Sequence, residues 1–146
     1  MRLFTIGFTR KSAEQFFGLL RESRATTLVD VRLNNVSQLA GFAKRDDLRF
    51  FLREICGMDY VHRVDLAPTQ TMLDSYKKRG ATTWAEYESQ FLELIGTRRI
   101  EETVPHKLLD NAVLLCSEDK PDHCHRRLVA EYIAQRWNSV DVTHLV

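Results

Sequence analysis

Features that this 146-residue chain lacks exclude several classes of protein. No apolar run approaches the roughly 20 residues of a membrane-spanning helix, so no membrane partner is expected. The net charge is only +1, which gives no global basic field for non-specific binding of nucleic acid. The N-terminal MRLFTIGFTR contains an apolar cluster too short for a signal peptide and no small-residue cleavage site. We therefore expect a cytoplasmic location.

Cysteine is scarce, and its spacing excludes several common sites. Cys56, Cys116 and Cys124 make an odd count, and a disulfide framework is not expected in a reducing compartment, so the thiols are predicted to be reduced. There is no CxxC motif. A tyrosine-phosphatase loop requires Arg six positions after Cys, whereas Asp122 stands six positions after Cys116. A glycine-rich dinucleotide fingerprint and a P-loop are also missing, so NAD or ATP bound in the usual manner is not expected.

Apolar runs alternate with helical patterns along the chain. Strands are predicted over residues 2–7, 27–31, 60–62, 112–115 and 140–145. Helices are predicted between them, over 12–24, from Asp46 or Asp47 to Ile55, over 70–78, over 84–95 and after Pro121. Strands interleaved with helices predict an α/β fold with a mostly parallel sheet of about five strands. No repeat or low-complexity linker divides the chain, so residues 1–146 are expected to form a single domain.

Local signals predict several helix ends. Ser12 with Gln15 and Thr83 with Glu86 have the spacing of capping boxes. Gly57 stands where a helix through Phe50 to Ile55 should end. The segment 100–111 contains Pro105 and is expected to be a loop plus a short helix.

Residues 33–45 form a long connection without a clear period. Its turn-favouring residues Asn34, Asn35, Ser37 and Gly41 predict irregular structure, and loops of this length in compact domains are often functional. Lys44 adds positive charge at its end. A binding loop and a solvated surface loop are equally compatible with this pattern.

Polar residues follow the predicted strands at their carboxyl ends. In parallel α/β sheets, ligands bind beyond this edge. The stretches concerned are Gly7 to Arg10, which includes Thr9, then Asp30 to Arg32, His62 with Arg63, and Cys116 to Glu118. Because Val29 and Val31 indicate a buried strand, Asp30 needs a partner, and Arg32 is the obvious one. Topology therefore predicts that these residues converge.

The stretch from Ala112 to Ile133 concentrates the chemistry. A buried strand leads through a polar turn into a helix that starts with Cys124-His125-Arg126-Arg127, and a helix N-terminus favours anions. The helical period turns Cys124 and His125 inward and places Arg126 on the flank. Arg127 is expected to pair with Glu131. A first-turn Cys beside His and Arg has reasons for a depressed pKa, which would make Cys124 a nucleophile or a metal ligand; a thiol packed as a small apolar residue is equally compatible.

Three functions remain open. The first is an enzyme or ligand-binding protein for a phosphate-bearing substrate, a nucleotide or nucleic acid, held by helix N–H groups, Arg32 and Arg126, with Asp30, Glu118 or His125 as acid or base. The second is a metal- or thiol-dependent site built on Cys116, Cys124 and His125. The third is a non-catalytic nucleic-acid or protein binding module that uses the connection 34–45.

Several motifs together resemble one known family. They are Thr5-Ile6-Gly7, Leu28-Val29-Asp30-Val31-Arg32, Gly41-Phe42-Ala43-Lys44, Leu114-Leu115-Cys116-Ser117-Glu118 and Cys124-His125-Arg126-Arg127. Over essentially the whole chain, the sequence is similar to the domain-of-unknown-function family 488. The resemblance implies a Rossmann-like three-layer α/β domain and no established activity. Phe8 stands where many members have His, and Val36 stands where many have Pro before Ser37.

The resemblance and the strand ends together give one candidate site. The motif positions implied by the resemblance are Thr5, Gly7, Asp30, Arg32, Cys116, Glu118, Cys124, His125 and Arg126. Expected catalytic residues are Asp30, Arg32, Glu118, Cys124 and His125. Expected substrate-binding residues are Thr5, Gly7, Thr9, Arg10, Lys44, Cys116 and Arg126. We assign no metal ligand and no cofactor at this point, and homo-oligomerisation stays open.

Overall fold

The sheet follows the predicted strands. The computed structural model describes residues 1–36, 41–78 and 80–146. Its strands are β1 (Arg2–Gly7), β2 (Thr27–Asp30), β3 (Asp59–His62), β4 (Ala112–Cys116) and β5 (Asp141–Leu145). They form one five-stranded sheet in the order β3-β2-β4-β1-β5, and all four neighbouring pairs are parallel. The predicted α/β class is confirmed, and each strand ends within one residue of its predicted bounds.

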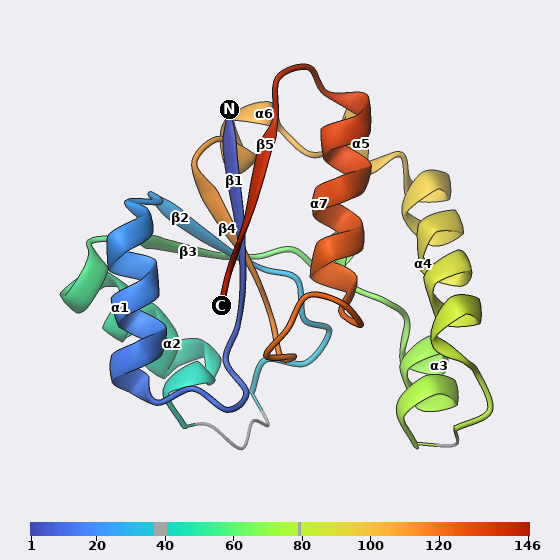
Figure 1. The fold of residues 1–146 in the computed structure, drawn as a ribbon, viewed down its shortest axis with the longest axis horizontal. Helices are drawn as coiled ribbons and strands as arrows, with labels where there is room; N and C mark the ends of the chain where they lie inside the picture. The colour runs from blue at the N-terminus through green and yellow to red at the C-terminus, as the bar shows by residue number, and fades with distance from the viewer. Residues whose placement is uncertain (37–40, 79) are drawn as a thin grey trace.

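Helices cover both faces of the sheet, which gives three layers (Figure 1). On one face lie α1 (Ala13–Ser23) and α2 (Arg45–Phe51), and on the other lie α4 (Trp84–Arg98) and α7 (His125–Arg136). Successive strand residues point to opposite faces, so Leu28 packs in the core under α1 while Val29 packs in the core under α7. Two apolar cores therefore hold the sheet between its helices.

Most of the predicted helix ends are confirmed. Ser12 with Gln15 and Thr83 with Glu86 form complete capping boxes at the starts of α1 and α4. The remaining helices are short: α3 (Gln70–Leu73), which continues as a π-helical turn through Lys78, α5 (Ile100–Thr103) and α6 (His106–Leu109). The segment 100–111 thus holds two short helices where one was expected.

The start of α2 was predicted incorrectly. Its N-cap is Lys44, which makes no side-chain capping hydrogen bond, and Asp46 and Asp47 lie inside the first turn. Carboxylates in the first turn interact favourably with the helix dipole, so they support the helix without capping it. The helix continues as a π-helical segment, Leu52–Cys56, and ends at Gly57 with φ 59°. This left-handed backbone is the conformation that favours Gly, as predicted.

The long connection after β2 is described only in part. Ser37 lies outside the described residues, whereas Gly41–Ala43 form a short 3-10 turn before α2. Asn35 is buried and donates to the hydroxyl of Tyr60 at 2.9 Å. No helix in the described ranges has the length and apolar character needed to cross a bilayer.

Candidate functional site

A pocket of about 210 Å³ opens at the carboxyl edge of the sheet. Residues from the ends of β2 and β4 form one part of its lining, and the start of α7 and the α3–α4 region form the rest. The lining residues are Arg32, Leu33, Asn34, Pro68, Leu73, Tyr76, Lys77, Trp84, Tyr87, Cys116, Ser117, Glu118, His123, Cys124 and His125. The pocket lies where parallel sheets bind ligands, so the predicted convergence of strand ends is found for β2 and β4.

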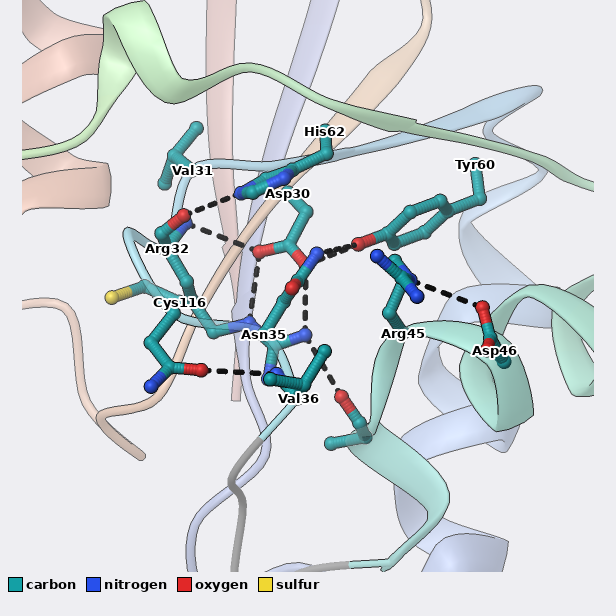
Figure 2. A network of polar contacts seen from close by, with 12 residues as sticks. Asp30, Val31, Arg32, Asn35, Val36, Arg45, Asp46, Tyr60, His62 and Cys116 are labelled. Carbon is teal, nitrogen blue, oxygen red and sulfur yellow. Dashed lines mark hydrogen bonds and ion pairs between the residues drawn. The ribbon is translucent and has the colours of Figure 1, made fainter.

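Asp30 and Arg32 form a buried ion pair beside this pocket, as predicted (Figure 2). The guanidinium donates twice to the carboxylate, from Nε to Oδ1 at 2.8 Å and from Nη2 to Oδ2 at 2.7 Å. Tyr60 donates its hydroxyl to the same carboxylate at 2.6 Å. Burial and the Asp30 carboxylate raise the pKa of Tyr60, so its hydroxyl stays protonated as a donor. Asp30 does not line the pocket; its carboxylate orients Arg32, which does.

Part of the Arg32 guanidinium remains unused. Nη2 also donates to the carbonyl of Ala43 at 2.8 Å, but Nη1 is buried without a hydrogen-bond partner in residues 1–36, 41–78 and 80–146. The ring of Phe8 packs on the guanidinium, with its centroid 5.3 Å from Cζ. Phe8, in the turn after β1, therefore contacts Arg32. A buried donor without a partner is costly, which makes Arg32 a candidate for ligand binding.

Two thiols and an imidazole meet on the floor of the pocket. Cys116 ends β4, Cys124 is the N-cap of α7 and His125 begins that helix, and all three are buried. The Sγ of Cys116 lies 3.5 Å from Nδ1 of His125, and the three ligand atoms all lie within 4.8 Å of one another. Nε2 of His125 lies 2.7 Å from the carbonyl oxygen of Val31. Because a carbonyl only accepts, Nε2 carries the proton and Nδ1 is the nitrogen with a free lone pair. Cys116 Sγ also lies 3.8 Å from Nε2.

The thiol pKa values differ from the prediction. Burial, together with the hydrogen bond to Cys116, raises the pKa of Cys124 well above its usual value. The hydrogen bond from Cys124, helped by the charge of Arg126, lowers the pKa of Cys116. Burial lowers the pKa of His125, which favours the neutral ring. The lower pKa of this pair therefore belongs to Cys116, because Cys116 accepts the hydrogen bond from Cys124, and the predicted depressed pKa of Cys124 is wrong.

Lys77 is a pocket residue that sequence reasoning missed. It forms an ion pair with Glu118, 41 positions further along the chain, so no local pattern could have revealed it. Burial alone would lower the pKa of Lys77, but the Glu118 carboxylate outweighs burial and raises it. Tyr76, Trp84 and Tyr87 stand nearby, with ring centroids 4.8–5.8 Å apart. These three aromatic residues form one wall of the pocket.

Arg126 is placed differently from the prediction. It was expected on the flank of its helix, but its side chain is completely buried and does not line the pocket. The guanidinium donates to the carbonyls of Glu118 and Asp119 and to Thr5 Oγ1. A Cβ on Gly7 would overlap the carbonyl of Glu118. Thr5, Gly7 and Arg126 therefore hold the turn after β4 in place.

The other expected binding residues also lie outside the pocket lining. Thr9 donates to the carbonyl of Ser117 at 2.6 Å, which ties the turn after β1 to the turn after β4. Arg10 is exposed and lines a separate surface hollow, and Lys44 is exposed at the start of α2. Of the expected site residues, the pocket brings together Arg32, Cys116, Glu118, Cys124 and His125.

One comparison with known proteins gave a match. The family model described as "Domain of unknown function DUF488" matches residues 12–133. The chain belongs to this family. The curated proteins and the solved structures gave no match. The DUF488 match includes Asp30, Arg32 and the thiol–imidazole cluster, whereas Thr5 and Gly7 precede it.

Proposed function

We propose that this DUF488 protein is an enzyme that acts on a small phosphate-bearing substrate, a nucleotide or the end of a nucleic acid, bound in the pocket at the carboxyl edge. The observation that carries the proposal is Arg32, a buried guanidinium in the pocket lining whose Nη1 has no partner in the described residues. A phosphate oxygen is the kind of acceptor that this donor lacks. The Asp30 carboxylate fixes the guanidinium before any ligand arrives, so little ordering would be needed on binding.

The pocket offers two further groups that can bind an anion, a lysine and a helix N-terminus. Lys77 lies in the lining with Glu118, and the N-terminus of α7, a helix of 12 residues, begins at the pocket floor. Helix N–H groups and the helix dipole attract negative charge. The Tyr76, Trp84 and Tyr87 wall offers an apolar surface for a planar ring. The thiols and the imidazole supply the reactive groups.

Lys77 and Lys78 make a matched pair for testing the anion site. Lys77 lines the pocket, whereas Lys78, its neighbour, has 75% of its side chain exposed and does not line it. Lys77→Met should weaken binding of the four nucleoside monophosphates at least about tenfold, the loss of roughly one charge-assisted contact. Lys78→Met should leave binding unchanged. Isothermal titration calorimetry measures both, with the uncharged nucleosides as controls.

Arg32→Lys tests the role of the Arg32 guanidinium, on which the proposal depends. Lys cannot donate in the bidentate geometry of Arg, so binding should weaken again. Circular dichroism at 222 nm reports whether the variant is folded. The proposal is wrong if nucleosides bind as tightly as their monophosphates, if none of the four monophosphates binds, or if both lysine variants lose binding equally.

A further inference from the structure

The thiol–imidazole cluster has the composition of a transition-metal site. Its two sulfurs and one imidazole nitrogen come from two elements, β4 and α7, that meet at the sheet edge. The three ligand atoms lie within 4.8 Å of one another, and Cys116 Sγ lies 3.5 Å from His125 Nδ1. In a tetrahedral zinc site with Zn–S of about 2.3 Å and Zn–N of about 2.0 Å, ligand atoms stand roughly 3.5–3.8 Å apart. The ligand atoms therefore already lie close to the spacing of a zinc site, and a turn of the imidazole would complete it.

The backbone selects the imidazole tautomer that metal binding through Nδ1 requires. The contact between His125 Nε2 and the Val31 carbonyl, at 2.7 Å, fixes the tautomer with the proton on Nε2. Histidines that bind metals through one nitrogen commonly donate from the other to a carbonyl or carboxylate. Nδ1 is thus left as the ligand atom. Cys116 Sγ lies 3.5 Å from Nδ1 and 3.8 Å from Nε2, so the ring must turn to direct the Nδ1 lone pair at an ion held by the two sulfurs.

We propose that Cys116, Cys124 and His125 bind one zinc ion whose fourth coordination position is open to the pocket. Two thiolates and a neutral imidazole are ligands that suit zinc, and two thiolates balance the charge of the ion in a buried place. The thiols release their protons to solvent when the metal binds. All three residues line the pocket, so the side of the ion not covered by protein faces the ligand space.

The number of protein ligands indicates the class of site. Structural zinc sites have four protein ligands, whereas sites with three keep a position for water or substrate. In the described residues, the metal-compatible group of this pocket consists of these three side chains alone. The inference deepens the proposed function and rests on it only for the claim that a phosphate-bearing substrate meets the open position.

The metal itself is the probe for the first experiment. Protein reduced with a phosphine, stripped with a chelator and titrated with Co²⁺ should develop thiolate-to-cobalt charge-transfer absorption that saturates at one ion per chain and is abolished by Zn²⁺. Plasma mass spectrometry should find one zinc per chain after zinc loading and dialysis. Cys116→Ser, Cys124→Ser and His125→Gln should each weaken zinc binding at least about 100-fold.

Cys56 provides the matched control. It is half-buried beneath α1, where its thiol contacts the Phe17 carbonyl, and it does not belong to the cluster. Cys56→Ser should bind zinc and cobalt like the wild-type protein. The proposal is overturned if the wild-type protein shows no cobalt–thiolate absorption, or if Cys56→Ser reduces metal binding as much as Cys124→Ser does. The wild-type titration decides the matter even where a variant fails to fold.

Nucleoside monophosphate binding, measured on stripped and zinc-loaded protein, separates this inference from the proposed function. Binding of monophosphates by a chain that takes up no metal would retain the proposed function and reject the zinc site. Zinc uptake at the three residues, without monophosphate binding, would retain the site and reject the proposed function.

Discussion

At the scale of single residues, Gly7 shows how a motif position can be needed for packing. The carbonyl of Glu118 occupies the space where a Cβ on Gly7 would stand, and Arg126 Nη1 lies 2.9 Å from that position. Glycine at the end of β1 thus lets the turn after β4 approach the backbone. The resemblance to a family suggested this residue for substrate binding, and the structure instead places it away from the pocket lining.

A pair of glycine variants tests this role. Gly7→Ala should lower the free energy of unfolding by about 2–4 kcal/mol, because the turn that carries Glu118 must move. Gly18→Ala should raise it by about 0.5–1 kcal/mol, because Gly18 lies inside α1 with open space around it. Urea denaturation measures both values. A small effect of Gly7→Ala would show that the turn is not held as described.

Asp30 also acts as a single residue, through the guanidinium it orients. Asp30→Asn leaves Arg32 as a buried charge without its carboxylate, which should cost about 3–5 kcal/mol of stability. A second Asp–Arg pair of the same spacing, Arg63 with Asp65, has its partners 24% and 36% exposed. Asp65→Asn should therefore cost no more than about 1 kcal/mol. Equal losses in the two variants, measured by urea denaturation, would contradict the role assigned to burial.

At the scale of elements, α7 is joined to the sheet by Arg126. The helix begins at the thiol cluster, and the Arg126 side chain reaches back to the carbonyls of Glu118 and Asp119 and to Thr5 of β1. The turn between β4 and α7 is thus fixed from both of its ends. This arrangement holds Cys116 and Cys124, eight positions apart, at one place.

Removing the charge of Arg126 should loosen this connection. Arg126→Met keeps much of the side-chain volume but leaves the Glu118 carbonyl without its donor and the Asp119 carbonyl with Lys11 alone, and we expect a loss of about 2–4 kcal/mol. Arg53→Met, on the surface with 66% of its side chain exposed, should cost under about 0.5 kcal/mol. Thermal unfolding compares the two variants. Amide hydrogen exchange should also speed up in the turn 117–124 of Arg126→Met, and unchanged exchange there would contradict the role of Arg126.

The elements were predictable where their signals are local. Strand composition, the Ser12 and Thr83 capping boxes and Gly57 each act within a few residues, and the predicted pairing of Arg127 with Glu131 is present at 3.1 Å. The places of Arg126 and Lys77 depend on partners from other elements. The helical period indicates the side of the helix from which Arg126 projects, but not which groups of other elements its guanidinium contacts. The burial of Arg126 could therefore not be predicted.

At the scale of the whole molecule, the strand order determines where the pocket can open. The strand β1 is followed by α1 on one face of the sheet, and the neighbouring β4 is followed by α7 on the other face (Figure 1). In parallel sheets, the crevice between two such strands is the usual place for a ligand. Here Gly7, the Glu118 carbonyl and Arg126 fill that crevice. The pocket opens instead over the ends of β4 and β2, beside α7. Strand order was not predictable from the sequence, because it depends on long-range pairing.

A metal on the pocket floor would link β4 to α7 and should therefore stabilise the whole fold. A ligand that binds only the native state adds about 4 kcal/mol of stability at a free concentration 1,000 times its dissociation constant. In a domain of about 150 residues this corresponds to a rise in Tm of about 10 °C. Zinc should produce this shift in the wild-type protein and in Cys56→Ser, and a chelator should reverse it, as differential scanning calorimetry would show. The Tm of Cys124→Ser should not change with zinc, because this variant lacks one of the three proposed ligands. A rise in its Tm would show that zinc stabilises the fold by binding elsewhere.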